Sequence, residues 1–594
     1  MAVEADNFGV EFVWRFFADA EALVAEVGEW YPKETQLADP LVRRSGALDP
    51  CSHENFASVR ESNMMQDKIV VRAACCGFVA VCLSAILSVP LMALPGPSPN
   101  PSLPPPSVTV TGPIALTTPL RDPAHGYPYN ATPINLAKHG YVEQEFFIEG
   151  KANAYNTPPG QTGSVKDTGH PFKTRIVVRR PKSASKFNGT VIVEWYNVSQ
   201  GHDGEYDWFQ SAEHILRAGY AWVGVTNQRV GANSLREWSP TRYGTLDVTD
   251  GGRIADDSLS YDIFTAAAVA IRGNGSADVM GGLKAARLIA IGHSQSAGRL
   301  YTYFQSVHPL IPKVYDAVVL HGGGGKVSED LDVKVFKLLN ETDVTGQANS
   351  RQSDTDNYRQ WEVAGSSHLD AQFSRTMAGL GLRVSGMDPV EGSPAITGPT
   401  ISGGAGNGQS GNGDNIAGTN VCKNPPFSRI PAYYVLDAAL DHTARWVKDG
   451  TPPPTATHIE LSELPPLPSD AQGANGAGGR GPQGARWEVV HNELGNAHGG
   501  IELSQHAVPT ATNTGQNEGG ARGGERNCNL MGSYLVWDEA RLASMYPTHA
   551  AYVAKVKEVT EKNLKAGYLV KEDADATIAE AEHSSIGRTK VTKR

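Results

Sequence analysis

Short apolar runs alternate with helical periods along most of this chain, and this alternation restricts the folds open to it. Thr190–Trp195 (TVIVEW) and Ala221–Thr226 (AWVGVT) are almost wholly apolar, as expected of strands buried on both faces. Between them, Asp207–Arg217 has the spacing of a helix. The alternation predicts an α/β fold, with a mostly parallel sheet, helices on both sides and ligands at the carboxyl ends of the strands. Further strands are expected at Tyr141–Ile148, Thr174–Arg179, Leu288–Ile291, Ala317–Leu320, Val335–Leu339 and Arg359–Gly365, and a further helix at Tyr261–Ile271.

Composition narrows the classes of function. The chain has 594 residues, of which 40% are hydrophobic, so it has ample material for a core. Its net charge is -11, and no basic stripe with interleaved aromatic residues occurs, which argues against a nucleic-acid partner. Neither a C-x-x-C pair nor an H-E-x-x-H motif occurs, so the sequence predicts no metal site and no cofactor.

The first hundred residues contain features that predict the cellular location of the protein. The apolar run Ala73–Leu94 is long enough to span a bilayer. Lys68 and Arg72 precede it, and the Pro-rich tract Pro95–Pro106 follows it, so the bulk of the chain is expected on the outside. The segment is expected to be a signal peptide or a signal anchor, and the protein secreted or anchored in a membrane through 73–94 and facing outward.

These signals divide the chain into four parts. Met64 or Met65 would make a good start for a signal peptide, in which case residues 1–63 are not translated; otherwise they form a tail. The remaining parts are a signal segment with a Pro-rich linker at 64–106, a catalytic α/β domain at 107–581 and a basic tail at 582–594. Within the domain, Gly-rich insertions occur near 391–420 and 470–484, and the domain ends in a helical extension.

One strand-turn-helix segment carries the chemistry. Leu288–Gly298 reads LIAIGHSQSAG, with Ser294 at the apex of the turn and a helical period after it. A serine in such a strained turn projects its hydroxyl over the sheet, and small residues two places on either side let strand and helix approach. Gly292 and Ser296 fill those places, although serine replaces the second glycine of G-x-S-x-G. Ser294 is therefore the predicted nucleophile.

A serine nucleophile needs a histidine base and a carboxylate that orients the histidine. Asp343 follows the run Val335–Leu339 directly enough to be this acid, and Glu341 is the alternative. His368 follows the last expected strand and is the predicted base, with His498 as runner-up. His293 precedes the acid in the chain and is expected to shape the turn or the pocket.

The oxyanion formed by serine attack needs preorganised N–H donors. The backbone of Gln295 is one expected donor, because it begins the helix after the nucleophile. The second is expected from Tyr196 or Asn197, after the strand that ends at Trp195. The run His321–Gly325 (HGGGG) looks like an oxyanion motif but follows the nucleophile, so it is predicted to be a Gly-rich turn.

Two of the six cysteines, Cys422 and Cys528, lie after the apolar segment. In an exported domain they could form a disulfide, and the alternative is a pair of buried free thiols.

With these residues in place, the chain resembles the α/β-hydrolase superfamily, and within it a group of large exported α/β-hydrolase-domain proteins of poorly known substrate. The resemblance extends from about residue 106 to about residue 581 and implies a triad of Ser294, Asp343 (or Glu341) and His368. The segments that carry it are Arg179–Pro181, Asn188–Ser199, Gly292–Arg299, Glu341–Val344, Trp361–Gly365 with His368, and Gly499–Ile501.

The sequence thus predicts a serine hydrolase that cleaves a small-molecule carboxylic ester through an acyl-enzyme on Ser294. Two alternatives stay open. The same triad could serve an amidase, lactonase or peptidase, or the fold could serve a non-catalytic binding protein at the cell surface.

Overall fold

The structure, a computed structural model, describes residues 103–120, 122–376, 422–465, 486–519 and 525–588, which all belong to one compact unit. The tail 1–63, the apolar segment 73–94 and the Gly-rich insertions 391–420 and 470–484 lie outside the described residues, so the expectations for them stay predictions. No helix in the described part of the chain is long and apolar enough to span a bilayer.

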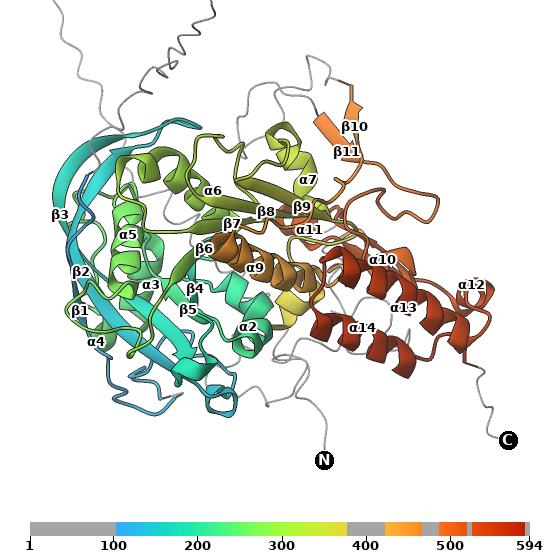
Figure 1. The fold of residues 1–594 in the computed structure, drawn as a ribbon, viewed down its shortest axis with the longest axis horizontal. Helices are drawn as coiled ribbons and strands as arrows, with labels where there is room; N and C mark the ends of the chain where they lie inside the picture. The colour runs from blue at the N-terminus through green and yellow to red at the C-terminus, as the bar shows by residue number, and fades with distance from the viewer. Residues whose placement is uncertain (1–102, 121, 377–421, 466–485, 520–524, 589–594) are drawn as a thin grey trace, which may run out of the picture. The chain divides into compact units, whose positions relative to one another are not determined.

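Nine strands form one sheet in the order β1-β2-β3-β5-β4-β6-β7-β8-β9 (Figure 1). The strands from β5 to β9 in this order pair in parallel, whereas β1, β2 and β3 are antiparallel to their neighbours, and β3 is antiparallel to β5. The predicted α/β fold with a mostly parallel sheet is confirmed. The strands are β1 Val108–Thr111, β2 Tyr141–Asn156, β3 Ser164–Pro181, β4 Thr190–Trp195, β5 Ala221–Val225, β6 Arg287–His293, β7 Ala317–His321, β8 Lys334–Asn340 and β9 Tyr358–Val363.

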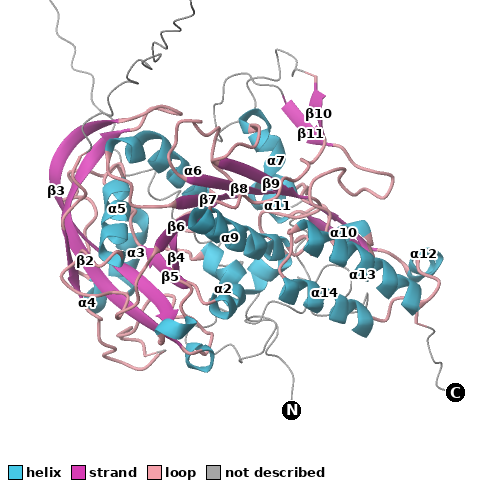
Figure 2. Ribbon diagram, viewed as in Figure 1, coloured by secondary structure: helices cyan, strands magenta, loops and turns pink. Residues whose placement is uncertain are grey.

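Helices cover both faces of the sheet because its central strands are apolar on both sides. In β4, Val193 packs in a core with residues of α5 and α6, while Ile192 packs in a second core with residues of α2 and α9. Figure 2 shows α2 and α9 side by side. The helices nearest the sheet are α2 Tyr206–Ala218, α3 Arg229–Trp238, α4 Pro240–Tyr243, α5 Ser260–Ile271, α6 Gln295–Thr302, α7 Glu341–Gln347 and α9 Ala432–Asp449.

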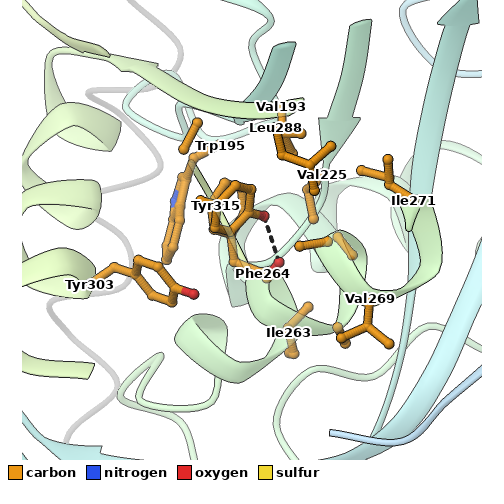
Figure 3. Close-up of a cluster of buried hydrophobic side chains, with 14 of the residues drawn as sticks. Val193, Trp195, Val225, Ile263, Phe264, Val269, Ile271, Leu288, Tyr303 and Tyr315 are labelled. Atoms are coloured by element: carbon orange, nitrogen blue, oxygen red, sulfur yellow. Dashed lines mark hydrogen bonds between the residues drawn. The ribbon is translucent and has the colours of Figure 1, made fainter. Parts of the chain in front are cut away.

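Figure 3 shows buried side chains of the first of these cores. Its aromatic rings interlock: the rings of Trp195 and Phe264 are 5.0 Å apart, and those of Phe264 and Tyr315 are stacked at 4.8 Å. The Tyr315 hydroxyl donates to the Phe264 carbonyl at 2.8 Å. Each buried aromatic ring stabilises the fold by roughly 1.5–3 kcal/mol, so this cluster gives β6 and α6 a rigid base.

The strands β2 and β3 have 16 and 18 residues and are two and three times as long as the sequence predicts. Both faces of this hairpin carry polar residues, some of which are buried as ion pairs, so the apolar alternation breaks off early. Arg175 contacts Glu145 at 2.9 Å, and Arg179 contacts Glu205 at 2.8 Å, and all four side chains are almost fully buried. Pairing is what allows such charges inside.

The chain ends in the expected helical extension. The helix α13 ends before Gly567, which caps it with φ 84°. The remaining elements are β10 Leu461–Leu464, β11 Arg486–Val489, α10 Ser504–Ala507, β12 Ala511–Thr514, α11 Glu525–Met531, β13 Ser533–Val536, α12 Glu539–Met545, α13 His549–Ala566 and α14 Lys571–His583.

Candidate active site

Ser294 occupies a sharp turn between β6 and α6. Its backbone has φ 61° and ψ -114°, a conformation that costs a non-glycine residue about 1–3 kcal/mol and is typical of functional sites. The Ser294 N–H donates to the His321 carbonyl at 2.8 Å. A Cβ on Gly292 would lie 3.0 Å from the Ser296 backbone, so the strand and helix approach as closely as the G-x-S-x-S pattern predicts.

The carboxyl end of β8 supplies an acid that contacts the predicted base. Nδ1 of His368 donates to Oδ1 of Asp343 at 2.6 Å. The second oxygen of Asp343 accepts the Asn340 N–H at 2.8 Å and caps α7. Burial alone would raise the pKa of Asp343, but the charge and hydrogen bond of His368 outweigh burial and hold the pKa below its usual value. Asp343 is therefore ionised and fixes the tautomer of His368.

The alternative acid, Glu341, is engaged elsewhere. Its carboxylate is fully buried and accepts the N–H groups of Gly365 at 2.6 Å and Gly515 at 2.8 Å. Of the two acids that the sequence left open, the geometry therefore pairs Asp343 with His368, and gives Glu341 the task of holding two loops together.

The loop that carries His368 is clamped from both sides. The His368 N–H donates to Oγ1 of Thr342 at 3.1 Å, and this hydroxyl donates to the Gly515 carbonyl at 2.7 Å. The next residue, Leu369, donates its N–H to the Leu530 carbonyl at 2.8 Å. Segments more than a hundred residues downstream thus position the predicted base. The runner-up, His498, lies exposed on the loop between β11 and α10.

The Gly-rich turn after β7 packs between the nucleophile and the base. A Cβ on Gly322, which has φ 65°, would lie 3.0 Å from Cε1 of His368, and one on Gly323 would lie 2.9 Å from the Ser294 carbonyl oxygen. Both positions require glycine because a side chain would have no space, as expected for a Gly-rich turn. Ser294, Asp343 and His368 converge at the carboxyl edge of the sheet.

The loop after β4 supplies a different oxyanion candidate from the predicted ones. The Asn197 N–H donates to the Gly204 carbonyl at 3.0 Å, and the Tyr196 N–H faces the Val225 carbonyl at 3.5 Å, so neither points to the turn at Ser294. The neighbouring N–H of Val198 contacts Oε1 of Gln295 at 3.4 Å. The backbone N–H of Gln295 begins α6, as expected. The N–H groups of the two predicted residues, Tyr196 and Asn197, thus have backbone partners of their own, whereas the Val198 N–H contacts the first residue of α6.

Tyr196 and Asn197 support the turn that carries Ser294. The Asn197 side-chain amide donates to the His293 carbonyl at 2.9 Å, which fixes the residue before the nucleophile. The Tyr196 ring is fully buried beside Trp222, with the ring centres 6.0 Å apart. Both residues therefore act through packing and the backbone of the turn.

Sequence reasoning missed a second buried His–Asp pair beside the first. His321, at the end of β7, contacts Asp207 of α2 through Nδ1 and Oδ1 at 2.8 Å. The ring of His293 lies 4.4 Å from both His321 and His368, centre to centre. Within the described residues neither ring nitrogen of His293 has a hydrogen-bond partner. Burial lowers the pKa of His293 well below its usual value, and both neighbouring histidines lower it further, so the ring is neutral.

Glu194, at the end of β4, is a structural support for this pair. Its carboxylate accepts the N–H groups of Asp207 and Trp208, each at 3.0 Å, and the indole N–H of Trp222 at 2.9 Å. It thereby fixes the start of α2, which carries the Asp207 side chain.

Two further site expectations concern metals and cysteines. Over the described ranges, no group of three His, Cys, Asp or Glu side chains is arranged to hold a metal ion. Cys422 and Cys528 form a disulfide. The bridge joins segments on either side of the base: the Ser428 N–H donates to the Met531 carbonyl, and the Ala371 N–H to the Ser428 carbonyl, each at 3.1 Å.

Comparisons with known proteins identify the family. Residues 110–579, most of the chain, match the model of a family described as "Alpha/beta hydrolase domain". None of the curated proteins matches the chain.

Among solved structures, the chain is similar to XC6422 from Xanthomonas campestris, described as an a/b serine hydrolase without lid, at 14% identity and a TM-score of 0.23 over 39% of this chain and 93% of that one. It is similar to an alpha-beta serine hydrolase homologue from Coxiella burnetii at 12% identity and a TM-score of 0.22 over 36% and 91% of the two chains. The rice cell wall degrading esterase LipA from Xanthomonas oryzae matches at 11% identity and a TM-score of 0.19 over 32% and 47%.

Proposed function

Because the chain belongs to the alpha/beta hydrolase domain family, we propose that it is a serine hydrolase that cleaves a small-molecule carboxylic ester. One observation carries the proposal: the His368–Asp343 pair lies across a glycine turn from a serine held at positive φ. A buried acid, an oriented imidazole and a strained serine together are the requirements for nucleophilic acyl transfer.

The reaction proceeds in two halves. Oγ of Ser294 attacks the acyl carbon while Nε2 of His368 takes its proton, and the ionised Asp343 stabilises the resulting imidazolium. The imidazolium then gives this proton to the leaving alcohol, which leaves an acyl-enzyme. In the second half His368 removes a proton from water, the hydroxide attacks the acyl carbon, and the acid departs as Ser294 regains its proton.

Backbone amides stabilise the oxyanion in this scheme. We assign this role to the N–H groups of Gln295 and Val198, since the first begins α6 and the second comes from the loop that faces the same turn. The N-terminus of α6 also favours negative charge at this position. Removal of one such donor typically costs a factor of 10² to 10³ in rate.

The test combines covalent labelling with turnover on the full chain. Wild type is expected to react with a fluorophosphonate probe and to hydrolyse p-nitrophenyl acetate. Ser294→Ala should lose both labelling and turnover, and His368→Ala should lose turnover by roughly 10³-fold or more. A panel of matched esters, amides and lactones then identifies the leaving group. A folded wild type that neither labels nor turns over would overturn the proposal and favour a binding protein.

We also propose that the protein works outside the reducing cytosol. The disulfide between Cys422 and Cys528 supports this, because disulfides persist in oxidising compartments. The apolar segment 73–94 with Lys68 and Arg72 before it supports the same location. Fractionation of the producing cells, with protease added to intact cells, tests it: a protein fully protected inside the cytosol would contradict the proposal.

A further inference from the structure

A cavity of about 120 Å³ lies between α2, α9 and α14, away from the nucleophile. Four aromatic side chains and five carboxylates line it, against a single guanidinium, that of Arg217. Mixed aromatic and acidic walls suit neither an anion nor a purely apolar ligand, because both would leave the carboxylates without a counter-charge.

The one guanidinium does not balance these acids. Arg217 contacts Asp573 at 3.2 Å and Glu572 at 4.0 Å, and one further acid, Glu205, is paired with Arg179. Of the other two acids, Glu213 is exposed, whereas Asp437 on α9 is buried and interacts with the charge of Asp573 on α14.

Asp437 and Asp573 are 4% and 5% exposed. Oδ1 of Asp437 and Oδ2 of Asp573 have no hydrogen-bond donor in the part of the chain that the structure describes. Burial raises the pKa of Asp437 well above its usual value, and the charge of Asp573 adds to this. Among the residues that line the cavity, ionised carboxylates have only the guanidinium of Arg217 as counter-charge, so a bound cation would favour their ionised forms.

The aromatic walls favour a particular kind of cation. Phe209 and the paired rings of Tyr433 and Tyr434, 4.6 Å apart, line the cavity, and aromatic rings attract alkylated ammonium groups. A cavity of roughly 150 Å³ holds a benzene ring, so this one admits a group of about five non-hydrogen atoms. Its size thus matches a trimethylammonium head group.

We propose that this cavity is a binding site for a small organic ammonium ion, with the alkyl groups against the aromatic rings and the charge against Asp437 and Asp573. The site is distinct from the triad. Phe209 in its wall contacts Phe373 at 6.3 Å between ring centres, and Phe373 in turn contacts Tyr206, which lies 6.0 Å from His293. One aromatic layer separates the two, and the inference does not depend on the proposed hydrolase activity.

Isothermal titration of the full chain with choline and with its neutral isostere 3,3-dimethylbutan-1-ol tests the site. The two probes have the same shape and differ in charge. Choline is expected to bind with one-to-one stoichiometry and at least tenfold more tightly than the alcohol. Absence of choline binding, or equal affinity for both probes, would overturn the proposal without any variant being made.

A matched pair of variants locates the binding. Asp437→Asn should weaken choline binding at least tenfold. Asp441→Asn, one turn further along α9, removes the same charge from a half-exposed residue that pairs with His214 outside the cavity, and should leave the affinity within twofold. Equal affinities in both variants, with thermal unfolding confirming that each is folded, would place choline elsewhere and reject the site.

Discussion

Glu341 and Asp343 lie two residues apart in α7, and their carboxylates have different partners. Asp343→Asn keeps the shape but removes the charge that fixes the tautomer of His368, so kcat should fall by roughly 10³- to 10⁴-fold with little change in stability. Glu341→Gln instead gives up one of two acceptors for the buried Gly365 and Gly515 amides, which should lower the free energy of unfolding by about 1–3 kcal/mol.

Kinetics and urea unfolding of both variants separate these roles. If Glu341→Gln lost the larger factor in kcat while Asp343→Asn stayed active, the assignment of the acid would be reversed.

The surroundings of Gly322 predict how a side chain at this position would affect activity. An alanine there would place Cβ 3.0 Å from Cε1 of His368 and 3.2 Å from Nε2 of His293, at a positive φ. We expect Gly322→Ala to displace the base and to lower kcat/KM at least tenfold, at a cost of about 1–2 kcal/mol in stability. Gly346→Ala, in α7 with nothing within 4 Å of its added Cβ, is the control and should keep full activity. Similar activities in the two variants would show that the turn tolerates a side chain.

Among single residues, the sequence predicted those that belong to a contiguous motif or directly follow a predicted strand. Ser294 stands in a recognisable turn, and Asp343 and His368 follow predicted strands. The His321–Asp207 pair could not be predicted, because it joins residues 114 positions apart and no motif links Asp207 to the run that begins at His321. The choice of amide in the loop after β4 depends on backbone hydrogen bonds that no residue type encodes.

Among the elements, the strands buried on both faces were predicted almost to the residue. The strand β4 occupies the predicted range, and β5 ends one residue before it, because burial on both faces makes a strand apolar throughout. The hairpin of β2 and β3 was underestimated because ion pairs such as Arg175–Glu145 put charges in its interior. The sequence does not distinguish a charged residue that is buried in an ion pair from one that lies on the surface.

The contact of α14 with α9 should make stability depend on pH. Burial raises the pKa of Asp573 to about 6, although Arg217 and His214 of α2 oppose the shift, and the unfolded value is near 3.9. The folded state thus holds this proton more tightly, so the associated stability is present below about pH 4 and is lost as the pH rises through 6, on the order of 1.4 kcal/mol for each pKa unit. Asp437→Asn removes the titration of Asp437, whose pKa is raised well above its usual value by burial and by the charge of Asp573, so the free energy of unfolding of this variant should fall less steeply over this range.

Urea unfolding at pH 4.5, 5.5 and 7 measures these slopes. Asp441→Asn serves as a control, because the titration of Asp441 should change the free energy of unfolding with pH in the opposite direction. Burial would raise the pKa of Asp441, but His214 holds it below its usual value, so this carboxylate contributes stability above pH 4 that the variant lacks. Parallel slopes for wild type and Asp437→Asn would refute the prediction.

For the whole molecule, the disulfide is the one covalent link between distant segments of the described chain. Cys422 and Cys528 are 106 positions apart, and closing a loop of this length stabilises a fold by about 3–5 kcal/mol. The Cys422→Ala/Cys528→Ala double variant should therefore unfold at a lower urea concentration than wild type without reductant. Wild type unfolded with dithiothreitol present should approach the variant, and coincident curves without reductant would show that the bridge adds nothing.

The sequence also could not show which late segments return to the site. The Thr342 hydroxyl donates to the Gly515 carbonyl and the Leu369 N–H to the Leu530 carbonyl, each across more than 160 residues, and the intervening Gly-rich stretch carries no periodic signal. Hydrophobic patterns identify an element and its buried face, but they do not identify its partner.

The clamp on the His368 loop has a consequence for the order in which the protein matures. A ribosome releases Ser294, Asp343 and His368 well before Gly515 and Leu530, which hold the base loop in place. The nascent chain therefore contains every reacting group and yet lacks their final alignment until its last tenth is being made. The proposed hydrolase is therefore expected to gain activity only after Leu530 has been made, and fragments left by earlier termination are expected to be inactive.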